Sequence, residues 1–303
     1  MRSSHTACRK IAALATLLSL VAVLSLTAAN PQATNSSRPP LSLNAARQLP
    51  SDLEIGGALA GLPPGTTRYV ALDSLLALRL TTFTVSDDSN FAGPTKVSGI
   101  PLEDLPRLLG ADPLADLVVV ICDDKYQATY PRAYIQEHHP LLVLRVNGEP
   151  PAKWPKDPES HSDMGPYMIS HPEFTASSTH FDQAQIPWGV VRIDFRSEKA
   201  VFDAIAPPQL RSDDAAVQTG YQIARQYCFH CHNAGSEGGQ KAGRSWQTLA
   251  TFASAAPDYF SAYVRDPKQK NAAAQMPANP GYDDATIRAL RDYFATFARS
   301  GKP

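Results

Sequence analysis

The sequence has little charge and no excess of either sign. Its 303 residues include 28 Lys and Arg against 29 Asp and Glu, which gives a formal net charge of -1. Proteins that hold a phosphate backbone carry a clear basic excess, so we expect no nucleic-acid partner. Hydrophobic residues nevertheless make up 43 % of the chain, which suffices for folded cores and argues against disorder throughout.

Long apolar runs and cysteines are also scarce. Only one stretch, near the N-terminus, approaches the length that a membrane span needs, which is about 20 residues. No cysteine closely follows that stretch, so a lipid-anchor site is absent from the sequence. Proline, with 26 residues, outnumbers glycine, with 17. Because proline breaks helix interiors, we expect many loops and short strands rather than long helices throughout.

The N-terminus has the pattern of an export signal. Three basic residues precede an apolar run over residues 11–26, and small residues follow it before Asn30. This order predicts a bacterial-type signal peptide over residues 1–29 and a periplasmic protein. The alternative is an uncleaved membrane anchor, although the run is short for that. Residues 30–40 are polar and proline-rich, which predicts a disordered leader.

Residues 41–208 are predicted to form an α+β domain in which strands outnumber helices around a mixed sheet. Apolar and alternating patterns predict strands over residues 68–72, 117–122, 141–146 and 189–195, and a short helix over 101–109. The turn pair Asn147-Gly148 ends the third of these strands. Residues 149–187 are rich in Pro, Ser and His and too long for an ordinary loop, which favours a functional lid or an insertion.

The composition changes after Pro207-Pro208, and residues 209–303 are predicted to form a separate all-α domain. Helices are expected over residues 215–227, 257–265 and 285–299. In the last of these, apolar side chains recur at helical spacing, and Asp283 or Asp284 is available as the N-cap. We find no internal repeat.

Cys228, Cys231 and His232 form the motif that decides the function. Two thiols three positions apart can each add to a vinyl group of haem, and the adjoining imidazole can then ligate the iron. A redox dithiol or half of a zinc site are the alternatives. No Cys or His follows His232 to complete a zinc site, and a helix rather than a strand precedes the motif, unlike a thioredoxin-type site. The motif therefore favours one covalently attached haem c.

The second axial ligand of the iron is expected downstream of the motif. Met276 and several lysines are the candidates there, whereas His230 is tethered beside the attachment site. Met276 precedes Pro277 in a loop between two helices, among polar and alanine neighbours, where a core methionine is unusual. A thioether ligand favours reduced iron and suits electron transfer. We predict His232 and Met276 as the axial pair, which leaves no open position for substrate.

The C-terminal residues resemble class I cytochrome c over about Asp213 to Ala298. The resemblance rests on the following residues: Gly220, Cys228 to His232, Gly238-Gly239, Gly243, Tyr263 to Pro267, Met276-Pro277 and Tyr293. It implies that the first and last helices cross at Gly220 and Tyr293 and that the glycine loop lines the haem edge. Trp246 is a candidate propionate contact or a core aromatic. The sequence departs from the family at Arg244-Ser245, where a proline is usual.

The first domain resembles part of the molybdopterin-binding domain of the sulfite-oxidase family. The resemblance rests on four segments in order: residues 97–102, 118–121, 123–128, and 141–148 with Pro150-Pro151. In that family a loop cysteine ligates molybdenum, whereas Cys122 ends a predicted buried strand. An inert buried thiol is therefore expected, and a degenerate module that lacks molybdopterin is favoured over one that holds it.

A histidine-rich stretch offers a second candidate site, for copper or another ion. Its members are His138, His139, His161, His171 and His180, with Asp163 and Met164 nearby. No pair has the i, i+4 spacing that would place two imidazoles on one helix face, so exposed or hydrogen-bonded histidines are expected. Trp154 and Trp188 are expected in the core.

Together these features predict an exported monohaem electron carrier or redox subunit whose first domain docks a redox partner. One alternative is a molybdenum-dependent periplasmic dehydrogenase that passes electrons to its own haem. Another is a haem-based sensor with a labile Met276 bond. The segment after Asp213 holds every predicted haem ligand, so we expect it to fold and bind haem alone.

Overall fold

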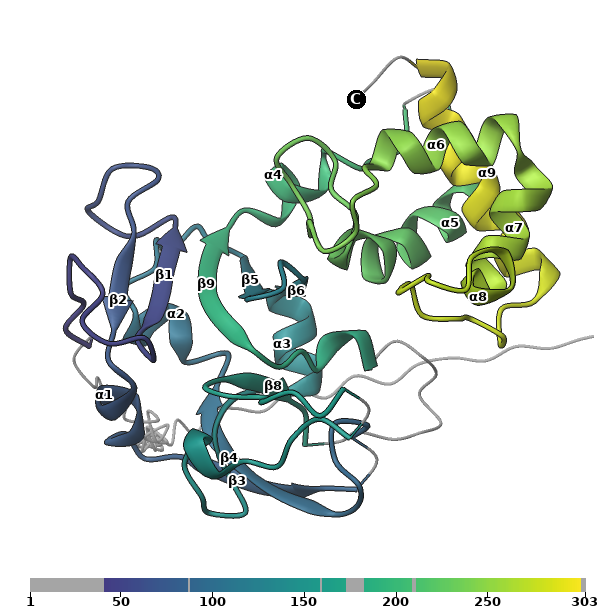
Figure 1. Ribbon diagram of the computed structural model, residues 1–303. Helices are drawn as coiled ribbons and strands as arrows, with labels where there is room; N and C mark the ends of the chain where they lie inside the picture. The colour runs from purple at the N-terminus through teal and green to yellow at the C-terminus, as the bar shows by residue number, and fades with distance from the viewer. Residues whose placement is uncertain (1–40, 87, 159, 173–182, 209–210, 301–303) are drawn as a thin grey trace, which may run out of the picture. The chain divides into compact units, whose positions relative to one another are not determined.

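The computed structural model describes residues 41–86, 88–158, 160–172, 183–208 and 211–300 (Figure 1). In this part of the chain a strand-rich, mixed-sheet region comes first and a helical region follows, which confirms the predicted fold class. The predicted signal peptide and leader lie outside the described residues. No helix in the described part combines the length and apolarity that a membrane span requires.

Two sheets form the strand-rich region. The five-stranded sheet has the order β2-β1-β9-β5-β6, with β2 Arg68–Val70, β1 Leu53–Gly57, β9 Val190–Arg196, β5 Leu117–Cys122 and β6 Gln127–Pro131. β1 and β9 are parallel and the other neighbours antiparallel, so this sheet is mixed. The four-stranded antiparallel sheet has the order β3-β4-β7-β8, with β3 Thr81–Val85, β4 Thr95–Pro101, β7 Leu141–Val146 and β8 Met168–Ser170.

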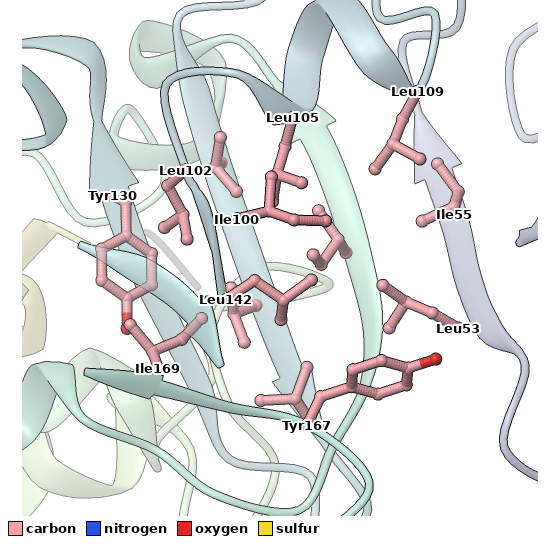
Figure 2. Close-up of a cluster of buried hydrophobic side chains, with 14 of the residues drawn as sticks. Leu53, Ile55, Ile100, Leu102, Leu105, Leu109, Tyr130, Leu142, Tyr167 and Ile169 are labelled. Carbon is pink, nitrogen blue, oxygen red and sulfur yellow. The ribbon is translucent and has the colours of Figure 1, made fainter. Parts of the chain in front are cut away.

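A hydrophobic core lies among these strands and short helices. Figure 2 shows side chains from both sheets and from α2, Leu105–Leu108, converging on one another. The labelled members are Leu53, Ile55, Ile100, Leu102, Leu105, Leu109, Tyr130, Leu142, Tyr167 and Ile169. Three further helices belong to this region: α1 Leu72–Leu76, α3 Arg132–His138 and α4 Glu198–Phe202.

Strand β5 is apolar along its whole length because both of its faces are buried. Val118, Val120 and Cys122 pack into the core shown in Figure 2. Leu117 and Val119 point the other way and join a second cluster that contains helical-region residues such as Phe229. This alternation is the period of two that a strand imposes. The run of β-branched residues thus links the sheet to the helical region.

Several predicted boundaries in the strand-rich region were wrong. The expected helix over residues 101–109 is reduced to α2, because Pro101 continues β4 and the Leu102 N–H donates to the Pro140 carbonyl at 2.9 Å. The strand expected over residues 68–72 ends at Val70, since α1 begins at Leu72. The stretch over residues 149–187 contains β8, an edge strand whose three residues are too few to give a sequence signal.

The helical region matches its prediction more closely. Its helices are α5 Ala215–Gln226, the 3-10 turn Cys228–His230, α6 Trp246–Ala255, α7 Pro257–Arg265, α8 Pro267–Lys270 and α9 Asp284–Ser300. α9, yellow in Figure 1, packs against α5 and α6. Asp283 is the N-cap, because its Oδ1 accepts the Thr286 N–H at 2.7 Å. α6 was not predicted, although Trp246, Leu249, Ala250 and Ala253 recur at helical spacing after the N-cap Ser245.

Helices α5 and α9 cross at Gly220, as the resemblance implied. A Cβ at Gly220 would lie 2.1 Å from the Ala289 carbonyl oxygen and 2.7 Å from the Tyr293 Cβ. Only glycine permits this approach between the two backbones. The crossing thus brings the first and last helices of the region together, and the segment that carries Cys228 and Cys231 follows the first of them.

Candidate haem site

The attachment motif lies at the end of α5. The Asp214 carboxylate caps this helix by accepting the Ala216 N–H at 3.0 Å. After Gln226 the chain tightens into the 3-10 turn, and the His232 N–H donates to the Cys228 carbonyl at 2.8 Å. This compact turn places the two thiols and the imidazole along the wall of one cavity.

The cavity has a volume of about 410 Å³ and brings together all four predicted ligands, Cys228, Cys231, His232 and Met276. Met276 is half-buried in the loop before α9. The remaining wall is largely apolar and includes Leu249, Phe252, Phe260, Val264, Leu290 and Phe294. Two thiols, one imidazole and one thioether around an apolar cavity fit a covalently attached haem.

Arg244 orients the His232 ring through its backbone. His232 is 8 % exposed, and its Nδ1 lies 2.6 Å from the Arg244 carbonyl oxygen. A carbonyl only accepts, so Nδ1 carries the proton and Nε2 keeps a lone pair for a metal. Burial lowers the pKa of His232, which favours the neutral ring. Every residue has a backbone carbonyl, so the absence of the family's usual proline at Arg244-Ser245 does not remove this contact.

Cys228 and Cys231 form no disulfide, and burial favours the protonated form of both thiols. Burial raises the pKa of Cys228 to about 12 and that of Cys231 to about 11. Lys241, another residue of the cavity wall, opposes the rise at Cys231. An unligated thiol pair in this setting remains neutral.

The glycine loop, residues 238–243, packs directly against the attachment motif, residues 228–232. A Cβ at Gly239 would lie 1.8 Å from the His230 carbonyl oxygen, and one at Gly238 would lie 2.5 Å from the Phe229 ring. Gly238 also has a φ of +85°, which favours glycine. Gly243 lines the cavity. These glycines let the loop cover the motif closely.

Two contributions to the site were missed at the sequence level. Helix α6 supplies Leu249 and Phe252 to the cavity wall, and Tyr126 reaches the wall from the loop between β5 and β6. For Tyr126, the charged and aromatic composition of residues 123–126 was the available sequence signal. Trp246 is fully buried in an aromatic cluster, with its ring 4.8 Å from that of Phe294, as expected for a core aromatic. Its indole N–H has no hydrogen-bond partner among the described residues, so the propionate contact stays a prediction.

Most of the other candidate residues do not converge, although the ring centroids of His138 and His171 lie 6.4 Å apart. Cys122 is 3 % exposed, and burial raises its pKa, as expected for an inert thiol.

His171 is buried with Nε2 3.0 Å from the Tyr134 hydroxyl, and His139 lies 3.6 Å from Glu103. Among the described residues, no three Cys, His, Asp or Glu side chains gather as a metal site. His180 lies outside them. Trp154, Trp188 and Met164 pack in or against a hydrophobic core, while His138 lies beside Tyr134 and His161 and Asp163 are exposed.

Comparison with known proteins supports a cytochrome c domain. Residues 215–294 match the family model described as cytochrome c oxidase, cbb3-type, subunit III. No curated protein matches the chain significantly. Among solved structures, the sulfane dehydrogenase SoxCD from Paracoccus pantotrophus is similar to it with a TM-score of 0.35 and 14 % identity, over 51 % of this chain. The match spans 40 % of that structure's chain.

The helical region is thus a cytochrome c domain, and such a domain implies haem c and electron transfer.

Proposed function

We propose that this chain is an exported electron-transfer protein with one haem c, held by Cys228 and Cys231 and ligated by His232 and Met276. The observation that carries the proposal is the single cavity that these four side chains line. The family match over residues 215–294 supports it. Both thiols, the imidazole and the thioether then have a role in one site.

Each ligand has a defined task. The cysteines fix the haem by thioether bonds, and His232 presents Nε2 because Arg244 holds its Nδ1 proton. Met276 offers a soft sulfur from the loop before α9. The bound haem supplies a one-electron couple, and the apolar side chains around it exclude water, which favours the reduced state.

A His/Met pair fills both axial positions, so the proposed role is electron carrier or redox subunit rather than complete catalyst. The strand-rich region is proposed to dock a redox partner protein or enzyme subunit. Molybdenum and pterin analysis of the purified holoprotein tests this against the molybdenum-dependent dehydrogenase. One pterin bound per chain would support the molybdenum-dependent dehydrogenase instead of the electron carrier.

Haem staining after denaturing electrophoresis tests the attachment directly. We expect stain on the wild-type chain and none on the Cys228→Ala/Cys231→Ala variant. Cys122→Ala is the matched control, because Cys122 is a free thiol outside the cavity wall, and it should keep full stain. Haem that extracts from the unmodified chain into acidic organic solvent would contradict the proposal.

Periplasmic localisation is proposed from the export signal over residues 1–29. Attachment of haem c after export fits this location. Fractionation of cells should place the haem-stained chain in the periplasm, and retention in the membrane fraction would favour the uncleaved anchor.

A further inference from the structure

The loop after β5 meets the attachment motif at one point and the glycine loop, residues 238–243, at two. The Tyr126 hydroxyl lies 2.9 Å from His230 Nδ1, the Gln240 N–H donates to the Lys125 carbonyl at 3.0 Å, and Lys241 Nζ lies 2.6 Å from Asp124 Oδ2. Tyr126 also lines the cavity together with Cys231 and Lys241. A residue of the strand-rich region therefore forms part of the proposed haem pocket.

The hydrogen bonds around Tyr126 have a defined direction. Its hydroxyl donates to the Ala184 carbonyl at 2.7 Å, so it accepts the proton on His230 Nδ1. His230 is fully buried, and its Nε2 has no hydrogen-bond partner among the described residues. The Tyr126 hydroxyl is thus the side-chain contact that fixes the His230 ring between the two attachment cysteines.

We propose that Tyr126 is a positioning residue of the haem site and that the Asp123–Tyr126 loop helps to set the haem reduction potential. The inference rests on the proposed haem attachment. Tyr126 lines the cavity together with Cys231, and its hydroxyl contacts His230 within the attachment motif. The Asp124 carboxylate neutralises Lys241, a cation of the same wall.

These two side chains act on the potential with opposite signs. Removal of the Tyr126 ring would admit water to the cavity wall that Tyr126 and Cys231 share, and polar surroundings would stabilise the more highly charged ferric state. Loss of the Asp124 charge leaves the Lys241 ammonium uncompensated beside the haem, which disfavours the ferric state. The first change lowers the potential and the second raises it.

The test is redox titration of the full-length holoprotein. At the wild-type midpoint we expect Tyr126→Ala to shift the ferrous-to-ferric ratio about tenfold toward ferric, which is about 59 mV for one electron. Asp124→Asn should shift the ratio toward ferrous, by less at high salt because the pair is half-exposed. Tyr126→Phe keeps the ring and should move the potential less than Tyr126→Ala does.

Tyr134→Phe is the matched control, since the Tyr134 hydroxyl also contacts a histidine, His171, but does not line the cavity. It should leave the potential unchanged. If Tyr126→Ala fails to fold, the potential of Asp124→Asn still tests whether the Asp123–Tyr126 loop helps to set the haem reduction potential. Covalent haem with a wild-type potential in Asp124→Asn and in any folded Tyr126→Ala protein would overturn the inference alone. Absence of covalent haem from the wild-type chain would overturn the proposed function instead.

Discussion

At the scale of single residues, the site depends on backbone groups as much as on side chains. The Arg244 carbonyl fixes the tautomer of His232, and this role is independent of the Arg244 side chain. A sequence motif therefore identified the imidazole but not the group that orients it. The same holds for Tyr126, whose partner His230 lies 104 positions away in the sequence.

Met276→Ala is expected to open the sixth coordination position while haem stays attached. The weak far-red charge-transfer band between sulfur and iron, which the resemblance to class I cytochromes c implies, should disappear from the ferric spectrum. The potential should fall, because a thioether ligand favours ferrous iron. Gln269→Ala, an exposed residue of α8 that does not line the cavity, is the control.

Carbon monoxide binding distinguishes an electron carrier, in which Met276 stays bound to the iron, from a haem-based sensor, in which the Met276 bond is labile. The ferrous Met276→Ala protein should bind carbon monoxide, and the wild type at neutral pH should not. An unchanged far-red band in the variant would identify another axial ligand. Ready binding by the wild type would favour a labile Met276 bond and hence the sensor reading.

His171 predicts a pH dependence of stability in the strand-rich region. Burial, with a smaller effect of His138, lowers its pKa from 6.5 to about 3. Between these values the unfolded chain binds a proton that the folded chain does not. This contribution to stability is complete above pH 6.5 and is lost as the pH falls toward 3. Denaturant unfolding of the wild type and of His171→Gln at pH 7 and 5 measures it.

The loss of stability caused by His171→Gln should be smaller at pH 5 than at pH 7, by about 2 kcal/mol for 1.5 pH units. The reason is that the variant has no imidazole to protonate in the unfolded chain. An equal difference at both pH values would contradict the lowered pKa of His171.

At the scale of elements, the crossing packs α5, the helix that leads into the attachment motif, against the last helix, α9. Gly220→Ala should lower the free energy of unfolding by about 2 kcal/mol, because its Cβ would lie 2.1 Å from the Ala289 carbonyl oxygen. Chemical denaturation of the holoprotein provides the measurement. Gly93→Ala is the control, since a Cβ there meets no atom within 4 Å. Similar stability of both variants would mean that the crossing can relax.

At the scale of the whole molecule, β5 joins the two regions. Leu117 and Val119 pack into the cluster that contains Phe229, and the Phe202 ring of α4 lies 5.9 Å from that of Phe229. The boundary near residue 208 stays a prediction. All proposed haem ligands follow it, but part of the apolar surface around them precedes it.

Residues 209–303, exported behind a signal peptide, should still attach haem. We expect a lower unfolding midpoint and a lower reduction potential than in the full chain. The isolated segment lacks Phe202, which packs against Phe229, and Tyr126, which lines the cavity. Haem-free, unfolded protein would show that the boundary is wrong. A potential and a midpoint equal to those of the full chain would show that the strand-rich region contributes nothing to the site.

The sequence alone determined the attachment motif, the helices α5, α7 and α9 to within two residues of their ends, and the strands β5, β7 and β9. These depend on local periodicity, caps and short spacings, which a linear pattern contains. Tertiary structure decided the end of β4 at Pro101, the edge strand β8, the Arg244 carbonyl beside His232 and the Tyr126 contact with His230. Each of these depends on a partner distant in the sequence, and side-chain type does not specify which backbone group or loop the fold places there.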